Sequence, residues 1–241
     1  MGMPVFVEII SEPATQDIYE KVFNYFTHID ERFSTYKETS EISAINRGER
    51  APEEYSAEMK EVLALSEETR RLTDGYFDIR VPGGLLDPSG LVKGWAINNA
   101  AQLLKKLGYA DFYVEAGGDI ETSGRNGKGE EWSIGIRNPF DRDKIVKVIY
   151  PRGHGVATSG TYARGAHIYN PHEKRAVESD LVSLTVIGGN VYEADRFATA
   201  AFAMGKKGMA FIEKSPELEG YAIDKQGIAV MTGGFEAYTK I

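Results

Sequence analysis

The sequence predicts an α+β fold: a single compact unit, residues 1–241, with mixed, largely antiparallel sheets flanked by helices. Strand-like runs follow one another between residues 112 and 187 instead of alternating with helices, which favours antiparallel pairing. The chain contains no tandem repeat, low-complexity tract or Pro/Ser-rich linker. Its 241 residues, 42% of them hydrophobic, suffice for one large core or two closely packed lobes.

The first third of the chain is predicted to hold a strand and two helices. Residues 5–10 form a strand-like apolar run, and apolar residues recur at about 3.6-residue intervals across 17–33, which indicates an amphipathic helix. The hydroxyl-rich segment that follows favours caps and turns. Ser56 before an apolar-periodic run predicts a capped helix to residue 72, which T-D-G then ends.

Turns, one long helix and a series of strands are predicted next. Gly83-Gly84 and residues 88–90 are turn signals, and a helix at 92–107 is closed by Gly108. Strands are predicted at residues 112–116, 132–137, 146–150, 155–158 and 181–187. Helices are predicted at 193–204 and 209–214, and closing strands at 220–224, 228–232 and 238–241.

Composition excludes several classes of function. A formal net charge of -8 argues against a nucleic-acid-binding surface, which needs a clustered cationic face. The absence of Cys excludes disulfides, thiolate metal sites and cysteine nucleophiles. No stretch is long enough for a membrane span, and the first residues lack the features of a secretory signal, so a cytoplasmic protein is expected. An exported protein trimmed of its leader would have the same sequence.

The segment from residue 156 to 199 contains the densest group of chemically active side chains. V-A-T-S-G-T-Y-A-R-G-A-H places hydroxyls, Gly160, Arg164 and His167 close together. His167 is a candidate base, a donor to phosphate, or a histidine satisfied within its loop. Asp195 and Thr199 lie four residues apart on one face of a predicted helix, an arrangement that suits a hard cation. The alternative is an N-cap aspartate and a threonine bonded to its own backbone.

Three further motifs are compatible with an anionic, planar ligand. The glycines of E-A-G-G-D, at 115–119, leave amides to face anionic oxygen or form a tight turn between two strands. L-D-P-S-G-L-V-K-G-W-A opens a helix whose first turn attracts phosphate, with Lys93 adding a charge; the alternative is a helix cap with a solvated lysine. Tyr36 in a polar loop either stacks on a planar ligand or is exposed without a role.

Taken in order, eight segments of the chain resemble the ApbE family of FAD:protein FMN transferases. They are M-G-M-P-V, S-T-Y-K-E-T-S-E-I-S-A-I-N, Y-F-D, L-D-P-S-G-L-V-K-G-W-A, E-A-G-G-D-I, W-S-I-G-I-R-N-P, V-A-T-S-G-T-Y-A-R-G-A-H-I-Y-N-P and A-D-R-F-A-T-A. The resemblance implies an α+β flavin transferase that binds FAD in an extended cleft with Mg²⁺ at the pyrophosphate. Such an enzyme cleaves FAD, releases AMP and attaches FMN through a phosphoester to a Ser or Thr of an acceptor flavoprotein.

The resemblance also assigns roles to individual residues. Asp195, Thr199 and the backbone carbonyl of Gly90 match the family's metal ligands, and His167 matches a histidine implicated in transfer. The flavin-contacting positions are matched by Met1, Tyr36, Phe77, Asp78, Asp87, Lys93, His167 and Ile168. No nucleic acid and no membrane span are expected.

Two departures from the family pattern bear on these assignments. Only residues 79–86 separate F-D from L-D-P, where the family has a longer insert, and Lys93 stands where several members have Glu. Two alternatives to transfer stay open: a Mg²⁺-dependent FAD pyrophosphatase that gives FMN and AMP, and a non-catalytic flavin-binding protein.

Overall fold

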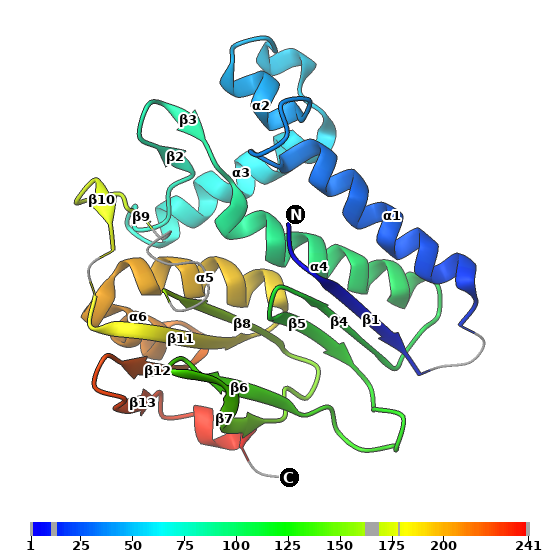
Figure 1. Ribbon diagram of the computed structural model, residues 1–241, viewed down its shortest axis with the longest axis vertical. Coiled ribbons are helices and arrows are strands. Elements are labelled where there is room, and N and C mark those ends of the chain that lie inside the picture. Colours follow the sequence, from blue (N-terminus) through cyan, green and yellow to red (C-terminus); the bar gives the residue numbers. More distant parts are fainter. Residues whose placement is uncertain (1, 11–13, 162–168, 178, 240–241) are drawn as a thin grey trace.

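The computed structural model describes residues 2–10, 14–161, 169–177 and 179–239 (Figure 1). A twisted sheet forms the centre, with helices on one face and a β-hairpin on the other. Met1, His167 and Ile168 lie outside the described residues. The predicted α+β class with largely antiparallel strands is confirmed.

The central sheet has seven strands in the order β1-β4-β5-β8-β11-β12-β13, and every neighbouring pair is antiparallel. The strands are β1 Val5–Ile9, β4 Phe112–Ala116, β5 Asp119–Ser123, β8 Gly155–Gly160, β11 Leu181–Gly188, β12 Glu219–Asp224 and β13 Ala229–Met231. Whereas β4 and β5 pair along their whole length, β5 and β8 pair only at Ile120 and Val156. The sheet therefore separates beyond that point.

Helices cover one face of this sheet. They are α1 Gln16–Phe33, α2 Glu41–Asn46, α3 Ala57–Leu72, α4 Ser89–Lys106, α5 Val191–Ala203 and α6 Gly208–Lys214. Apolar side chains of α1, α3 and α4 pack with β4, and those of α5 and α6 pack with β8, β11 and β12. Burial of these surfaces at about 25 cal/mol per Å² is the main force that holds the helices to the sheet.

The other face of the sheet is covered by the hairpin of β6 Ile134–Asn138 and β7 Asp141–Ile149, together with the 3₁₀ turn Phe235–Tyr238. Ile134, Ile136 and Ile149 of the hairpin pack against residues of β5, β8 and β11. The small hairpins β2 Arg80–Val81 with β3 Leu85–Leu86, and β9 Tyr169–Asn170 with β10 Arg175–Ala176, lie at the edge of the helical layer (Figure 1). Short 3₁₀ turns occur at Pro52–Glu54 and Gly205–Lys207.

Most elements match their predictions, and several differ, among them the short strands β2, β3, β9 and β10, which were not predicted. The helix predicted from residue 92 starts at Ser89, because Pro88 precedes its first turn, so Ser89 and Gly90 of the turn predicted at 88–90 lie inside the helix. The segment predicted as caps and turns contains α2, whose N-cap Ser40 accepts a hydrogen bond from the Ser43 amide. β5 was not predicted as a strand. The strand predicted at 238–241 is wrong at its start, since Tyr238 ends a 3₁₀ turn; residues 240–241 lie outside the described part.

Within the described ranges, no helix combines the length and the apolar character that crossing a membrane requires.

Candidate functional site

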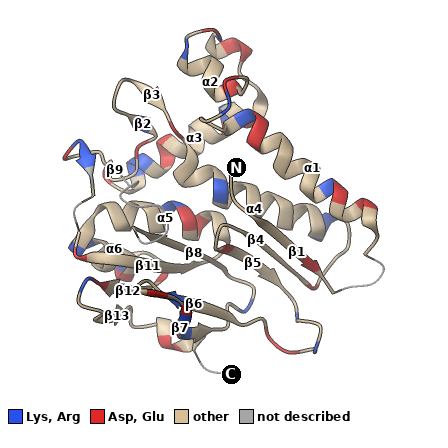
Figure 2. Ribbon diagram, viewed as in Figure 1, with Lys and Arg blue, Asp and Glu red and all other residues tan. Residues whose placement is uncertain are grey.

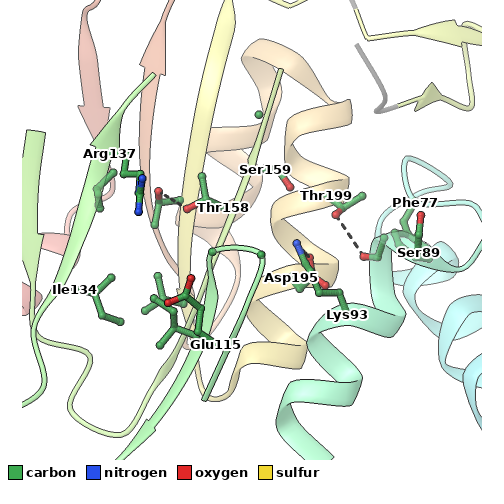
Figure 3. Close-up of a pocket in the computed structure, with 18 of the residues that line it drawn as sticks. Phe77, Ser89, Lys93, Glu115, Ile134, Arg137, Thr158, Ser159, Asp195 and Thr199 are labelled. Atoms are coloured by element: carbon green, nitrogen blue, oxygen red, sulfur yellow. Dashed lines mark hydrogen bonds and ion pairs between the residues drawn. The ribbon is translucent and has the colours of Figure 1, made fainter. Parts of the chain in front are cut away.

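A cleft of about 510 Å³ opens where β5 and β8 separate, and residues from both faces of the sheet line it (Figure 3). At this point the Thr158 amide of β8 donates a hydrogen bond to Oδ1 of Asp119 at 3.1 Å. A side-chain acceptor thus replaces the backbone carbonyl that a continued β5–β8 pairing would supply. Gly117 and Gly118, at φ 59° and 94°, turn the chain between β4 and β5 and line the cleft. E-A-G-G-D is thus a tight turn between two strands whose glycines border the cleft, and the contact of its amides with anionic oxygen stays a prediction.

One end of the cleft is polar and lies between α4 and α5. Lys93 Nζ is 2.5 Å from Oδ2 of Asp119 and 3.6 Å from Oδ1 of Asp195. The other oxygen of Asp195 accepts a hydrogen bond from the Gly94 amide at 2.8 Å. Both carboxylates are buried, so one lysine faces two acidic groups in a site of low solvent access.

Burial raises the pKa of Asp195 above its ordinary value; the Lys93 ammonium opposes the shift, and the Asp119 carboxylate adds to it. A buried carboxylate of this kind favours a cation as neighbour, since a positive charge stabilises its ionised form.

The residues predicted to bind a metal come together at this end. α5 places Asp195 and Thr199 on one face, and the Thr199 hydroxyl donates to the Gly90 carbonyl on α4 at 3.3 Å. The alternatives considered for the pair are wrong: the N-cap of α5 is Asn190, and Thr199 bonds to α4 instead of its own helix. The metal assignment itself stays a prediction.

The donor set is chemically suited to a hard cation. A carboxylate, a hydroxyl and a backbone carbonyl are oxygen ligands of the kind that Mg²⁺ takes beside water and substrate phosphates. Across the described ranges, no group of three or more His, Asp or Glu side chains is placed to hold a metal ion. A cation at Gly90, Asp195 and Thr199 would therefore need additional oxygens from its ligand.

The other end of the cleft is largely apolar and belongs to the β6–β7 hairpin. Ile134, Ile136 and Ile145 line it, and Ile145 is 52% exposed. Glu115 of β4 lies between the two ends (Figure 3), and Tyr113 of β4 and Arg137 of β6 also line the cleft. The cleft thus joins a charged end to a surface suited to a planar ring.

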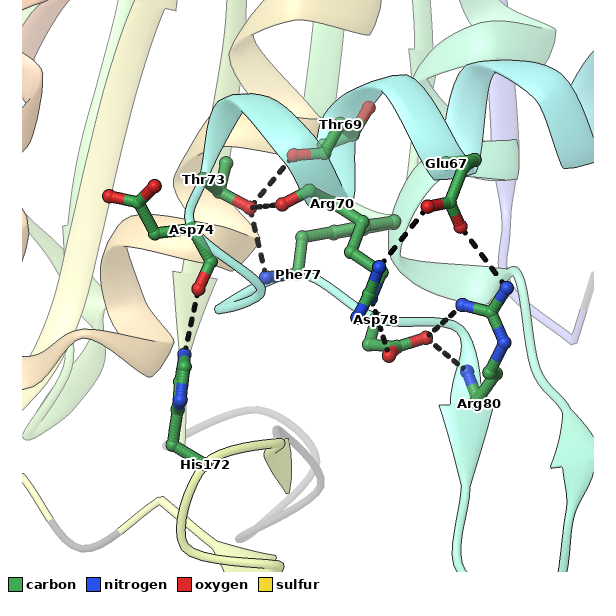
Figure 4. Close-up of polar contacts among 9 residues, drawn as sticks. All are labelled: Glu67, Thr69, Arg70, Thr73, Asp74, Phe77, Asp78, Arg80 and His172. Atoms are coloured by element: carbon green, nitrogen blue, oxygen red, sulfur yellow. Dashed lines mark hydrogen bonds and ion pairs between the residues drawn. The ribbon is translucent and has the colours of Figure 1, made fainter.

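The turn after α3 forms a further wall and carries Phe77 and Asp78 (Figure 4). The Phe77 amide donates to the Thr73 hydroxyl at 3.1 Å, which fixes the turn to the end of α3. The Asp78 carboxylate accepts bonds from Arg70 at 3.1 Å and from the side chain and amide of Arg80 at 3.2 and 2.9 Å. Asp78 therefore reaches the cleft with its charge already paired.

The remaining predicted residues differ in their placement. Asp87 lines the cleft, and its Oδ1 accepts a hydrogen bond from the Ser89 amide at 3.0 Å, at the start of α4. Tyr36 does not line the cleft, and its side chain is 98% exposed, so the structure does not bring it to the other flavin-contacting candidates. Met1, His167 and Ile168 are predictions that lie outside the described residues.

Sequence reasoning missed Tyr113 and Arg137, which line the cleft, and Gly94, which lies beside Asp195 where α4 meets α5. A Cβ on Gly94 would lie 2.6 Å from Cβ of Asp195, so only glycine permits this approach of α4 to α5. A glycine inside a predicted helix was the available signal. Tyr113 and Arg137 gave no such signal, because each lies in an ordinary strand pattern.

Comparisons with known proteins agree with this architecture. The model of the ApbE family matches residues 1–83 and 81–222. The FAD:protein FMN transferase of Escherichia coli K12 is 30% identical over 166 residues, which cover 65% of this chain and 47% of that protein. The FAD:protein FMN transferase from Vibrio cholerae is 25% identical over 275 residues, which cover 88% of this chain and 82% of that protein. The chain thus spans about half the length of the relatives that it matches first.

Solved structures show the same fold. The flavin transferase ApbE from Vibrio cholerae superposes with a TM-score of 0.86 at 24% identity, covering 99% of this chain and 96% of that one. The ApbE protein from Thermotoga maritima gives a TM-score of 0.88 at 22% identity, and the superposition covers 100% of this chain and 97% of that one. Family model, relatives and fold agree with the order of motifs along the chain, and together they show that this chain belongs to the ApbE family.

Proposed function

We propose that this protein is a Mg²⁺-dependent FAD:protein FMN transferase. It would cleave FAD, attach FMN through a phosphoester to a Ser or Thr of an acceptor flavoprotein, and release AMP. The single observation that supports this most is the two-ended cleft, whose polar end suits a pyrophosphate and whose apolar end suits a ring. The names of the relatives in the same family point to the same reaction.

The polar end would bind the pyrophosphate. Asp195, Thr199 and the Gly90 carbonyl would hold Mg²⁺, and Lys93 would contact a phosphate oxygen. When bound, Mg²⁺ neutralises charge that develops on the pyrophosphate as its P–O bond breaks. Lys93 would exchange part of its contact with Asp119 for the phosphate, which a flexible ammonium permits.

In the transfer step, the acceptor hydroxyl oxygen forms a bond to the phosphorus of the FMN half. The bond from that phosphorus to the bridging oxygen breaks, and AMP leaves with the electron pair. The hydroxyl proton passes to a base, for which His167 is the candidate by resemblance. Asp119 is a weaker candidate, since its oxygens are engaged by Lys93 at 2.5 Å and by the Thr158 amide at 3.1 Å.

The decisive experiment incubates the protein with FAD, Mg²⁺ and an acceptor peptide that contains Ser or Thr. Mass spectrometry detects an FMN adduct on the peptide, and chromatography detects AMP. Adduct together with AMP supports transfer, AMP without adduct identifies a pyrophosphatase, and neither product identifies a binding protein. His167→Ala should lower the rate by roughly 100- to 10,000-fold with FAD affinity nearly preserved.

A further inference from the structure

Glu115 is an acidic side chain in the middle of a cleft that we assign to an anionic ligand. It lies on β4, lines the cleft between the polar and the apolar ends, and is half-buried (Figure 3). Like charges in a partly buried site repel, so a carboxylate at this position weakens phosphate binding unless it has a compensating contact.

Tyr113, two residues earlier on the same face of β4, fixes the orientation of Glu115. Its hydroxyl donates to Oε2 of Glu115 at 2.5 Å. Burial raises the pKa of the Tyr113 phenol above its ordinary value, and the Glu115 carboxylate adds to the shift, so the phenol keeps the proton that it donates. Within the described part of the chain, this is the one side-chain hydrogen bond of the carboxylate. Its other oxygen has no hydrogen bond from the residues that the structure describes, and we expect it to face the ligand.

A carboxylate accepts hydrogen bonds and donates none. The groups of a flavin dinucleotide that can donate to it are the sugar hydroxyls and the ring N–H groups, not the phosphates. We propose that Glu115 is a specificity-determining residue, which accepts a hydrogen bond from a sugar O–H or ring N–H of the dinucleotide while Tyr113 holds it in place. The inference rests on the proposed function and adds the means by which the cleft would select a nucleotide over a bare phosphate.

Glu115→Gln tests the inference through two probes with opposite expected shifts. The variant keeps the size of the side chain but loses its charge. FAD affinity should fall on the order of 10- to 100-fold, because a neutral amide oxygen is a weaker hydrogen-bond acceptor than a carboxylate. Affinity for inorganic pyrophosphate, which has no such donor, should rise about 2- to 10-fold, because a repulsive charge is gone. Both titrations are made in EDTA, so that metal-dependent turnover does not consume FAD.

FAD binding that stays unchanged or becomes tighter in Glu115→Gln would overturn the inference. Tighter binding is the result expected if Glu115 only repels the phosphates of FAD. A fall in affinity for both probes would also overturn it, since that identifies a structural defect. Titrations with FMN and with ADP then show which half of the dinucleotide supplies the donor. The half that makes the contact should lose affinity in the variant, and the other half should not.

Two more variants keep the test independent of folding. Glu8→Gln removes a negative charge from an exposed residue that pairs across the strands with Tyr113 but does not line the cleft, so both affinities should stay within about twofold of wild type. Tyr113→Phe keeps the Glu115 carboxylate but removes the hydrogen bond that orients it. FAD affinity should fall less than in Glu115→Gln, and pyrophosphate affinity should not rise. If wild-type protein binds FAD but yields neither adduct nor AMP, the proposed function fails while this inference still stands.

Discussion

Asp195 makes a different contact with each of its two oxygens. One accepts the Gly94 amide at 2.8 Å, and the other lies 3.6 Å from Lys93. The same carboxylate supplies the one formal negative charge of the donor set that Gly90 and Thr199 complete. The Gly94 bond to Oδ2 holds α4 against α5, and we expect Oδ1 to contact the metal, so the two roles are separable.

Asp195→Asn should lower Mg²⁺-dependent AMP release by about 100-fold or more, because a carbonyl oxygen replaces a charged ligand. The amide can still accept from Gly94, so the thermal midpoint should change little. AMP release is measured by chromatography over a Mg²⁺ titration. Asp180→Asn, which removes an exposed carboxylate paired with Lys206, serves as the control. Near-normal release in folded Asp195→Asn would contradict the metal assignment.

At the scale of elements, α5 depends on β5 for part of its N-terminal capping. Glu121 of β5 is buried and accepts the amide of Val191, the first residue of α5, at 2.7 Å. A carboxylate at a helix N-terminus interacts favourably with the helix dipole. Burial nevertheless raises the pKa of Glu121 to about 7, a shift that the Val191 amide and Lys105 of α4 oppose.

This raised pKa predicts a pH-dependent stability. Between the ordinary pKa of about 4.5 and the folded value of about 7, the folded state binds more protons than the unfolded state. The free energy of unfolding should therefore fall as pH rises through this window. Glu121→Gln accepts the same amide without titrating, so its stability relative to wild type should increase from pH 4 to pH 8 by up to about 3 kcal/mol.

Urea denaturation of Glu121→Gln and wild type at several pH values measures this difference. Exposed Glu173→Gln should show no comparable trend. A difference between Glu121→Gln and wild type that does not vary with pH would disprove the raised pKa.

Because α4 and α5 approach closely at Gly94, replacing this helical glycine with alanine should lower the stability of the protein instead of raising it. Gly→Ala inside a helix normally stabilises by about 0.5–1 kcal/mol. At Gly94 the added methyl would lie 2.6 Å from Cβ of Asp195 and 2.7 Å from the Val191 carbonyl. Gly94→Ala should therefore destabilise the protein by about 1–3 kcal/mol through overpacking, and should also lower turnover by displacing Asp195.

Denaturant midpoints and AMP release test this prediction. Gly189→Ala is the matched control, since its methyl would meet only Glu217 Oε2 at 3.7 Å. A Gly94→Ala protein as stable and active as wild type would show that the two helices can separate at no cost.

At the scale of the whole molecule, the cleft exists because two layers contribute one end each. Helices α4 and α5 supply Lys93 and Asp195, and the β6–β7 hairpin on the opposite face of the sheet supplies Ile134, Ile136 and Ile145 (Figure 1). Acidic and basic residues occur in both layers of the molecule (Figure 2). The net charge of -8 makes the protein as a whole repel an anionic ligand, so binding has to come from local contacts. Each layer should accordingly bind a different part of the ligand.

Ile145→Ser tests this division of the cleft. Ile145 is 52% exposed, so its replacement should change stability by less than about 0.5 kcal/mol. FAD affinity should fall on the order of fivefold from lost apolar contact, while pyrophosphate affinity stays unchanged. Isothermal titration measures both. Val146→Ser changes the next residue, 38% exposed and outside the cleft lining, and should affect neither affinity. Equal losses for both ligands would contradict the division.

The sequence by itself determined those features that depend on neighbouring residues. The capped helix from Ser56 and the amphipathic period of α1 follow from local spacing, and both are confirmed. The helical period also sufficed to place Asp195 and Thr199 on one face. The order of motifs along the chain identified the family, because a family pattern is itself a property of linear order.

Only the tertiary structure decided which of these features meet. Thr199 bonds to Gly90, 109 positions away, and no local spacing encodes that contact. The segments that contain Glu115 and Tyr36 are both compatible with a ligand by sequence alone. In the structure, Glu115 lines the cleft that opens where β5 separates from β8, whereas Tyr36 is exposed outside it. The physical reason is that local backbone preferences act over a few residues, whereas the cleft results from the packing of two layers across a sheet.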